Sequence, residues 1–306
     1  MYSESRIRDA KVFARACTSN LLARFAPASY VRLTGQTGRG SSEENVEEIA
    51  DYFERSFNDY RDRLHLDDGG FAAFLQGRRI LEYGPGDILG VALLMYAAGA
   101  DHVHCVDRFP LEHVSVKNAR VYQRLLERMS GAARLRAGSA FVQAGRPESG
   151  FRPECIDYRV SEDGLAAREG AYDFIISRAV LEHVNSLERT LADVELCLAA
   201  GGVSVHNVDL RSHNLDRYQP YDFLTWPVWA YRLMYSHKGF PNRWRPGRYR
   251  DILASRTLRL RAMEPTGKLP PEDIARMRPH LAKPFRDAHD DDLSWLGFWI
   301  VLESTR

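Results

Sequence analysis

A short apolar run that ends in an acidic residue and two glycines constrains the fold of this chain most. Residues 80–90 read Ile-Leu-Glu-Tyr-Gly-Pro-Gly-Asp-Ile-Leu-Gly, and a second apolar stretch follows. This order predicts a buried strand, a tight turn at Gly84 and Gly86, and a helix that starts directly afterwards. Because glycine has no Cβ, such a turn lets the backbone approach a ligand closely at a helix N-terminus. The segment therefore indicates a site for a nucleotide-like cofactor.

Short apolar stretches alternate with longer amphipathic ones from residue 79 onward, which predicts an α/β protein with a doubly wound sheet. The expected strands span residues 80–83, 103–107, 155–160, 173–177, 202–208, 258–263 and 297–302. The expected helices between them span residues 88–99, 111–129 and 186–198.

The ends and interruptions of this alternation suggest how the chain is organised. Apolar residues at helical spacing predict a helical N-terminal cap over residues 1–75, with a polar loop at 34–42 and a helix starting after Ser42. The main domain is then expected over residues 76–306. Two segments within it break the pattern: 131–152, which we expect to be an inserted surface segment, and 210–250, a long aromatic and basic insertion. An insertion after a strand of an open α/β sheet can form a wall of the substrate site.

Composition narrows the class of protein. The net charge of +1 gives the whole chain no attraction for nucleic acid or membranes, so any basic patch must be local. The four cysteines form no Cys-x-x-Cys pair, which favours free thiols in a reducing cytosol. The longest apolar run, residues 88–98, is shorter than the ~20 residues of a membrane-spanning helix, and no leader peptide is recognisable. We expect a soluble, cytoplasmic protein with no metal site.

Two carboxylates and a strand-helix segment strengthen the interpretation of the glycine turn. Glu82, at the end of the first strand, can accept from a cofactor's ammonium group or simply order the turn. Asp107 ends the second strand, at the spacing where a carboxylate pairs with both ribose hydroxyls, although it can also be an ordinary strand-end residue. A further strand runs into a helix over residues 171–184, and Leu-Ala-Ala-Gly-Gly leads into the next strand from residue 198.

Together these motifs resemble the class I S-adenosylmethionine-dependent methyltransferases. The resemblance rests on Glu82-x-Gly84-x-Gly86, Asp107, the Tyr-Asp-Phe-Ile-Ile-Ser strand with Leu-Glu-His-Val after it, and the Gly-Gly turn, and it covers residues 79–208. It implies a Rossmann-like, seven-stranded sheet whose last strand, near residues 293–302, is antiparallel. The cofactor it implies is S-adenosyl-L-methionine.

The same resemblance implies roles for individual residues. The loop from Glu82 to Asp87, with Gly84 and Gly86, would surround the methionine part of the cofactor. Asp107, with Arg108 beside it, would bind the ribose. The position expected to bind the adenine amino group holds Ser161, so Glu162 or Asp163 would substitute for the usual acid. Ser177 and Arg178 would lie beside the transfer site.

Methyl transfer to a hydroxyl needs a base near the strand ends, because the protein must align the acceptor and remove its proton. The candidates are His183, His206, Asp209 and His213, each of which can instead be a packing or hydrogen-bonding residue. The Glu182-His183 pair also resembles a metal-holding stretch of some ubiquinone-pathway O-methyltransferases, but Ala179 stands where that pattern has a further Glu. We therefore assign no metal.

The insertion is the candidate for the acceptor site, because aromatic side chains and arginines can stack a ring and hold a carboxylate or phosphate. The residues we assign to the acceptor are Tyr221, Trp226, Arg243, Arg245 and Tyr249. They favour a small-molecule or glycan-type acceptor that carries a negative charge, as in type 11-like methyltransferases of glycans and natural products. The insertion can equally be an apolar core with a solvated basic face. Single-stranded nucleic acid is a third alternative, but the neutral total charge and the lack of an Asn-Pro-Pro-Tyr motif weigh against it.

Two other functions remain open beside O-methylation. A nicotinamide-dependent oxidoreductase would use the same glycine turn and acidic strand end, although Leu89 replaces the third glycine of its fingerprint. A non-catalytic protein with the methyltransferase fold would use the insertion to bind a partner. Homo-oligomerisation is also left open by the sequence.

Overall fold

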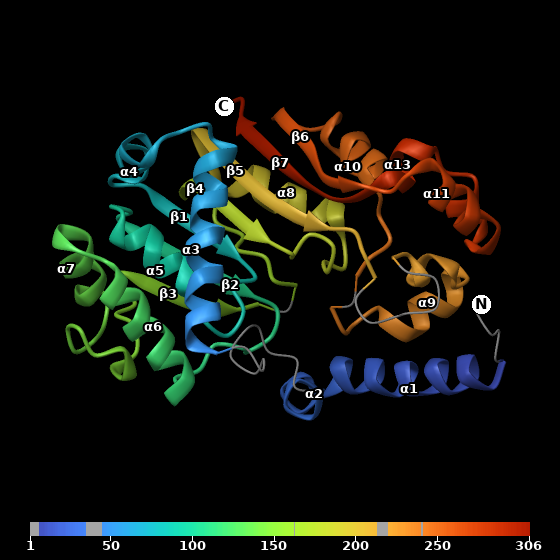
Figure 1. Cartoon of the computed structure of the whole chain (residues 1–306), viewed down its shortest axis with the longest axis horizontal. Helices are drawn as coiled ribbons and strands as arrows, with labels where there is room; N and C mark the ends of the chain where they lie inside the picture. Colours follow the sequence, from blue (N-terminus) through green and yellow to red (C-terminus); the bar gives the residue numbers. More distant parts are fainter. Residues whose placement is uncertain (1–5, 35–44, 162, 213–219, 240) are drawn as a thin grey trace.

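The fold is built on one mixed sheet. The structure, a computed structural model, describes residues 6–34, 45–161, 163–212, 220–239 and 241–306. Its seven strands are β1 (Arg79–Tyr83), β2 (His102–Asp107), β3 (Ile156–Val160), β4 (Tyr172–Arg178), β5 (Leu198–Asp209), β6 (Leu258–Lys268) and β7 (Trp295–Ser304). They lie in the order β3-β2-β1-β4-β5-β7-β6, and the first five are parallel. β7 pairs antiparallel with both β5 and β6. The expected Rossmann-like sheet with an antiparallel last strand is confirmed (Figure 1).

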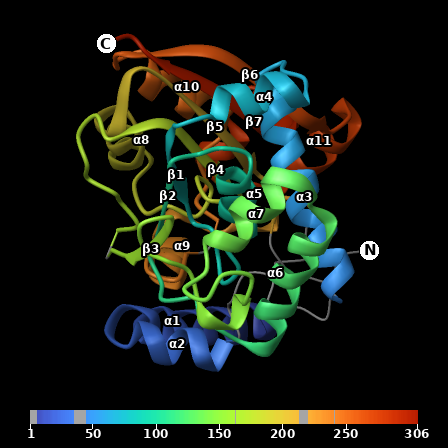
Figure 2. The ribbon, with the colours of Figure 1, turned by 90° about the vertical axis from the view of Figure 1, so that its left-hand side faces the viewer.

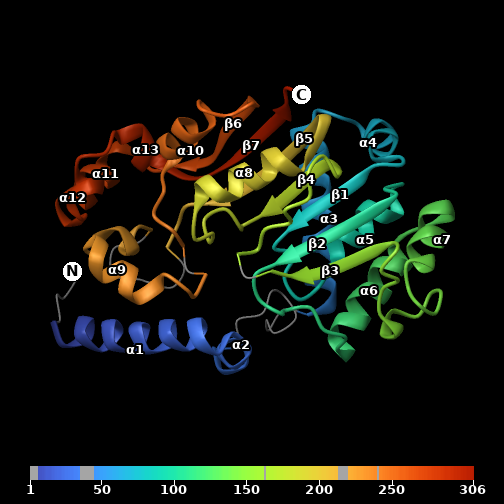
Figure 3. The same cartoon turned by 180° about the vertical axis from the view of Figure 1, so that it is seen from behind.

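Helices cover both faces of the sheet, as its buried strands require. On one face, a core cluster joins the strands to α3 (Val46–Arg63), α4 (Asp68–Leu75), α5 (Gly90–Ala97), α6 (Val116–Arg128) and α7 (Gly131–Ser139). On the other face, a second cluster joins them to α8 (Leu187–Cys197) and α10 (Pro246–Leu253). The view from behind shows α8 crossing the sheet on this second face (Figure 3).

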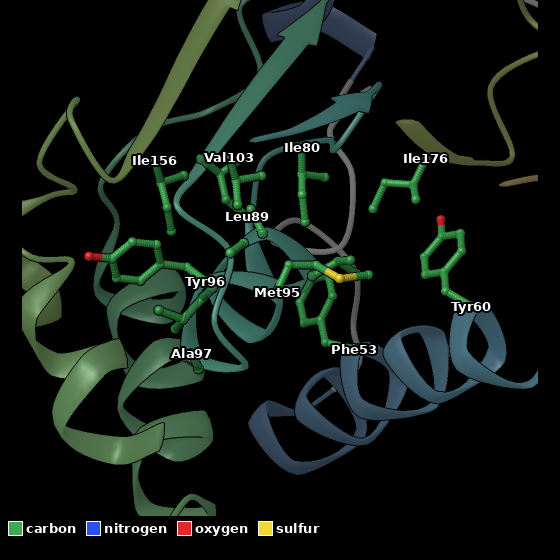
Figure 4. Packing of buried hydrophobic residues seen from close by; sticks show 14 of the residues in the cluster. Phe53, Tyr60, Ile80, Leu89, Met95, Tyr96, Ala97, Val103, Ile156 and Ile176 are labelled. Atoms are coloured by element: carbon green, nitrogen blue, oxygen red, sulfur yellow. The ribbon is translucent and has the colours of Figure 1, made fainter. Parts of the chain in front are cut away.

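Helix α3 shows how the N-terminal segment joins the main core. Asn45 caps it in a capping box, in which the Asn45 side chain accepts from the Glu48 backbone and the Glu48 carboxylate accepts from Asn45 N–H. Its buried residues, among them Phe53 and Tyr60, face the sheet and α5 (Figure 4). The expected helical character of the N-terminal segment is confirmed, with α1 (Arg6–Phe25) and α2 (Pro27–Thr34) ahead of α3. The loop expected at 34–42 falls almost entirely outside the described residues.

Residues 131–152 differ from the expectation of a surface insertion. They form α7 and a short 3-10 helix, η1 (Pro147–Ser149), and they bury Ala137, Ala140 and Phe141. Arg136 donates to the carbonyl oxygens of Tyr96 and Ala100 at 2.7 and 2.6 Å. The Gly-, Ala- and Arg-rich composition suggested a surface segment, but its small residues let α7 pack against α5, and Arg136 binds part-buried carbonyl oxygens.

The described part of the insertion contributes to a separate hydrophobic core. It contains η2 (Asp222–Thr225) and α9 (Val228–Tyr235), which pack with α1 and with α11 (Pro271–Met277), α12 (Lys283–Arg286) and α13 (Asp290–Ser294). The short η3 (Arg278–His280) follows α11 and buries no residue. The turned view places α1 and α2 below the sheet domain, with α9 above them (Figure 2). In the parts of the chain that the structure describes, no helix combines the length and apolarity needed to cross a membrane.

The contact between α3 and α5 predicts a large effect for one added methyl group. A Cβ on Gly90 would lie 2.3 Å from the Phe53 ring, whereas a Cβ on Gly138, in α7, would meet nothing closer than 3.7 Å. We expect Gly90→Ala to lower the free energy of unfolding by about 1–3 kcal/mol through overpacking. Gly138→Ala should leave it unchanged or slightly raised, because alanine favours helix. Urea denaturation of both variants is the measurement, and equal stabilities would contradict the packing argument.

Candidate active site

One pocket lies where the parallel strands β1, β2 and β4 end. Its cavity volume is about 190 Å³, and ligands of open α/β sheets bind at this edge. The residues that line it are Tyr83, Gly84, Gly86, Val106, Asp107, Arg108, Phe109, Leu111, Asp163, Gly164, Ala179, Val180, His183, Val184, Thr190 and Gly239. The pocket therefore brings together the glycine turn, the end of β2 and the turn after β4.

The floor of the pocket depends on two turns that approach closely. Gly84 and Gly86 have φ of +60° and +80°, which few other residues adopt without strain. A Cβ on Gly84 would lie 2.5 Å from a methyl carbon of Val180, in the turn after β4. That turn starts at Ala179, whose φ of +54° is itself in the left-handed region. Only glycine at position 84 permits this approach.

Asp107 is fixed at the edge of the pocket. Its Oδ1 accepts hydrogen bonds from the backbone N–H groups of Arg108 and Phe109 at 2.6 and 3.2 Å. Burial raises the pKa of this carboxyl above its ordinary value, and the backbone donors oppose that rise. Asp163 also lines the pocket, together with Gly164. Glu162, the other candidate for the adenine contact, lies outside the described residues.

Arg108 crosses the pocket from one wall to the other. It follows β2, and its Nη1 donates to Asn185 Oδ1, after β4, at 2.8 Å. Its guanidinium lies 4.7 Å from the centre of the Phe109 ring. Burial lowers its pKa, and it forms no ion pair with a described residue. The pocket therefore holds one arginine beside two carboxylates, Asp107 and Asp163, which raise the pKa of Arg108 against the effect of burial.

The other cofactor candidates are placed away from the pocket lining. Glu82 lies on the α3 face, where the Cys105 thiol donates to it at 3.9 Å and burial raises its pKa to about 8. Asp87 is buried, and its carbonyl accepts from Asn118. Ser177 is buried against His206, and Arg178 pairs with Asp59 of α3 at 2.7 Å. These four residues pack next to the glycine turn and the strand ends but do not line the pocket.

Of the four candidate bases, His183 is the one that lines the pocket. His206 is fully buried in β5; its Nδ1 shares a 2.7 Å hydrogen bond with Ser177 Oγ, and burial lowers its pKa to about 3. Asp209 pairs with Arg211 at 2.7 Å. His213 lies outside the described residues. The described residues contain no group of three side chains able to hold a metal ion.

The turn that carries His183 is attached to the insertion by Asn242. Asn242 Nδ2 donates to the carbonyl oxygens of Leu181 and Val184 at 2.7 and 3.4 Å, and its backbone N–H donates to the carbonyl of Glu182. Glu182 Oε1 in turn accepts from the backbone N–H of Asp209 at 3.2 Å. The position of His183 is therefore set from both the insertion and the end of β5.

The residues assigned to the acceptor make contacts within the protein. Arg245 is buried and donates to Tyr221 Oη at 2.8 Å and to the carbonyls of Leu210 and Trp295 at 3.0 and 2.7 Å. Arg243, whose pKa burial lowers to about 10, donates to the carbonyl of Trp226 at 2.6 Å. The acceptor candidates that are fully buried and absent from the pocket lining are Tyr221 and Tyr249. The alternative interpretation, an insertion with an apolar core, agrees with these contacts.

Several lining residues have no signal in the sequence. Gly239 comes from the insertion, and a Cβ there would lie 2.6 Å from Arg108 Nη2. Phe109, Leu111 and Thr190 are ordinary apolar or small residues that only the fold brings to the pocket. Gly164 is different, because the Asp-Gly pair after β3 marks a turn that pattern analysis can find.

Comparison with known proteins decides the family. A model of the methyltransferase-domain family matches residues 51–258, from within α3 to the start of β6. The chain belongs to this family. As an enzyme with the class I methyltransferase sheet, it takes its methyl group from S-adenosylmethionine. None of the curated proteins matches the methyltransferase.

Solved structures similar to this methyltransferase include two S-adenosylmethionine-dependent methyltransferases. The one from Mesorhizobium loti has 17% sequence identity and a TM-score of 0.40, with 75% of this chain and 92% of that chain covered. The one from Methanosarcina mazei has 13% identity and a TM-score of 0.42, with 75% and 93% covered.

The residues of the pocket fit S-adenosylmethionine. Gly84 and Gly86 line the pocket with positive φ and no Cβ, and Asp107 offers a carboxylate that can accept from two hydroxyl groups. Gly84 and Gly86 would hold the methionine part, and Asp107 the ribose.

Burial of Glu182 predicts a dependence of stability on pH. Its carboxyl is fully buried, and burial raises its pKa from 4.5 to about 8. The folded protein thus keeps a proton that the unfolded chain releases, so this contribution to stability is complete below pH 4.5 and is lost as the pH rises to 8. Glu182→Gln cannot ionise, and should become more stable than the wild type by about 1.4 kcal/mol per pH unit within that window.

Urea denaturation at several pH values between 5 and 8 measures this difference. Glu272→Gln, at an exposed position in α11, is the matched control and should follow the wild-type curve. If the difference in the free energy of unfolding between the wild type and Glu182→Gln stays constant across this pH range, the carboxyl of Glu182 is not buried in its protonated form.

Proposed function

We propose that this methyltransferase transfers a methyl group to a hydroxyl oxygen of a small-molecule or glycan-type acceptor. The observation that carries the proposal is that His183 lines the same pocket as Gly84, Gly86 and Asp107. An imidazole beside the cofactor pocket supports the removal of a proton from a hydroxyl acceptor at near-neutral pH.

The bound cofactor supplies an electrophilic methyl group on a positively charged sulfur. In the proposed reaction, His183 would accept the proton of the acceptor hydroxyl, and the cofactor held by Gly84, Gly86 and Asp107 would supply the methyl group that the oxygen receives. Asn242 holds the turn of His183 in place through the carbonyls of Leu181 and Val184. Alignment of acceptor and methyl group then provides most of the remaining rate acceleration.

One arginine in the pocket supports a negatively charged acceptor, against the opposite charges of Asp107 and Asp163 in the same lining. Arg108 lines the pocket without an ion pair to a described residue, so it can bind a carboxylate or phosphate of the acceptor. All four cysteines are free, which supports a location in the reducing cytoplasm.

Cofactor binding is predicted to depend on Asp107. Asp107→Ala removes an acceptor for the ribose hydroxyls, and we expect it to raise the Kd for S-adenosylhomocysteine by about 10- to 100-fold. Isothermal titration calorimetry with S-adenosylmethionine and S-adenosylhomocysteine is the measurement. Asp101→Ala, at an exposed position just before the other end of β2, is the matched control and should bind like the wild type. Absence of wild-type binding at millimolar cofactor would refute the cofactor assignment.

Replacing His183 is predicted to lower the rate of methyl transfer, whereas replacing His206 is predicted to lower the stability of the fold. His183→Ala should lower kcat by ~10²-fold while the Kd for S-adenosylhomocysteine stays constant. His206→Ala should lower the free energy of unfolding by about 1–3 kcal/mol, because it leaves a cavity and deprives Ser177 of its partner, and should keep kcat of the folded enzyme. A panel of hydroxyl acceptors assayed for methyl transfer, together with urea denaturation, separates the two effects. An unchanged kcat in His183→Ala would exclude this residue as the base.

A further inference from the structure

Three helices expose an unusual number of large apolar side chains. Six of the thirteen large apolar residues exposed in the described chain lie on α1, α2 and α9, so these side chains are concentrated in one part of the molecule. They are Leu21 (55% exposed), Phe25 (74%), Leu33 (70%), Val228 (52%), Trp229 (65%) and Leu233 (55%). Large apolar residues clustered on a surface usually mark a binding site.

The three helices form one continuous unit. Asn20 of α1 donates to the carbonyl of Leu233 in α9 at 2.9 Å, and the rings of Phe13 and Trp229 lie 6.1 Å apart. α2 follows α1 directly, and both run along the outer edge of the molecule (Figure 1). The opposite sides of α1 and α9 are buried in the separate hydrophobic core, for example at Ala16 and Met234, and that of α2 is buried at Tyr30. Apart from the contact of Trp229 with Phe13, the exposed apolar side chains belong to none of the described core clusters.

Positive charge accompanies the apolar side chains. The exposed cations of the three helices are Lys11, Arg15, Arg24, Arg32 and Arg232, and none of them forms an ion pair with a described residue. The acidic residue on these helices is Asp9, in the first turns of α1, while α2 and α9 contain none. Since the whole chain has a net charge of only +1, this basic character is local.

We propose that α1, α2 and α9 form a basic-apolar face that docks on an anionic lipid surface. Helices with leucine, phenylalanine and tryptophan beside arginine and lysine lie in the membrane interface, where the apolar side chains enter the boundary of headgroups and acyl chains. The arginine and lysine stems extend so that their charges reach the lipid phosphates. This inference does not depend on the proposed O-methylation.

Charge and side-chain type favour a lipid surface over other occupants. A second copy of the chain would bring two unpaired basic surfaces together, which costs electrostatic energy. Single-stranded nucleic acid prefers aromatic platforms on which bases stack, whereas Leu21, Leu33, Val228 and Leu233 are aliphatic.

The buried side of α1 and α2, opposite the basic-apolar face, contacts residues of the cofactor pocket. Ala23 of α1 and Tyr30 of α2 are buried in one cluster with Phe109, and Leu111 packs against it. Phe109 and Leu111 line the pocket. A lipid surface bound to the face would therefore be separated from the pocket by the helices themselves.

Co-sedimentation of the full chain with lipid vesicles tests the proposal. We expect binding to vesicles of phosphatidylglycerol and phosphatidylcholine, little binding to pure phosphatidylcholine, and weaker binding as salt rises from 0.05 to 0.5 M. The triple variant Arg15→Gln, Arg24→Gln and Arg32→Gln should bind about 100-fold more weakly, at about 1 kcal/mol for each charge near the surface. The double variant Phe25→Glu and Trp229→Glu should lose binding as well.

The matched control is Val116→Glu with Leu135→Glu, which alters side chains 72% and 78% exposed on α6 and α7. It should bind vesicles like the wild type, and calorimetry with S-adenosylhomocysteine should show that every variant is folded. The proposal is overturned by absence of wild-type binding, by equal binding to both lipid compositions, or by an equal loss in the control. Light scattering that shows a dimer dissociated by Phe25→Glu and Trp229→Glu, without vesicle binding, would assign the face to a second copy instead.

Discussion

The close approach of two turns, one after β1 and one after β4, is the constraint on which the rest of the site depends. Gly84 and Val180 are so near that a Cβ on Gly84 would overlap a valine methyl group. Parallel strands place their carboxyl ends at one edge, and this contact brings the edges of β1 and β4 into a single floor. Asp107 and His183 are then fixed on either side of it. A bulkier residue at position 84 would separate the turns and open the floor.

The two halves of the molecule contribute different things to the site. The sheet and its helices supply the glycine turn, Asp107 and the left-handed turn at Ala179, all held by buried contacts on both faces. The second core, formed by α1, the insertion and the segment between β6 and β7, supplies Gly239 and the hydrogen bonds of Asn242. The pocket is thus completed by chain segments that are distant in sequence.

Patterns in consecutive residues predicted those parts of the fold that depend on interactions between neighbours in the sequence. The strands, the glycine turn and the place of Asp107 were predicted because strand periodicity and turn chemistry show in consecutive residues; the helix expected to follow β4 directly at His183 was wrong, since a turn lies there and α8 begins at Leu187. The burial of Arg245 was not predicted, since its carbonyl acceptors lie 35 and 50 residues away and any residue type can supply a carbonyl. The aromatic and arginine-rich insertion suggested a binding surface for the same reason. In the structure its arginines bind carbonyl oxygens and a tyrosine of the protein itself. Gly239 and Thr190 could not be found, because only tertiary packing brings them to the pocket.

Asn242 contacts only main-chain atoms of the turn that carries His183. Its hydrogen bonds end on the carbonyls of Leu181, Glu182 and Val184, which every amino acid possesses. Mutations that alter the side chains of that turn therefore leave the attachment intact, and so do mutations elsewhere in the insertion that preserve Asn242. This arrangement lets the rest of the insertion diverge during evolution while the backbone of the turn that carries His183 keeps its position.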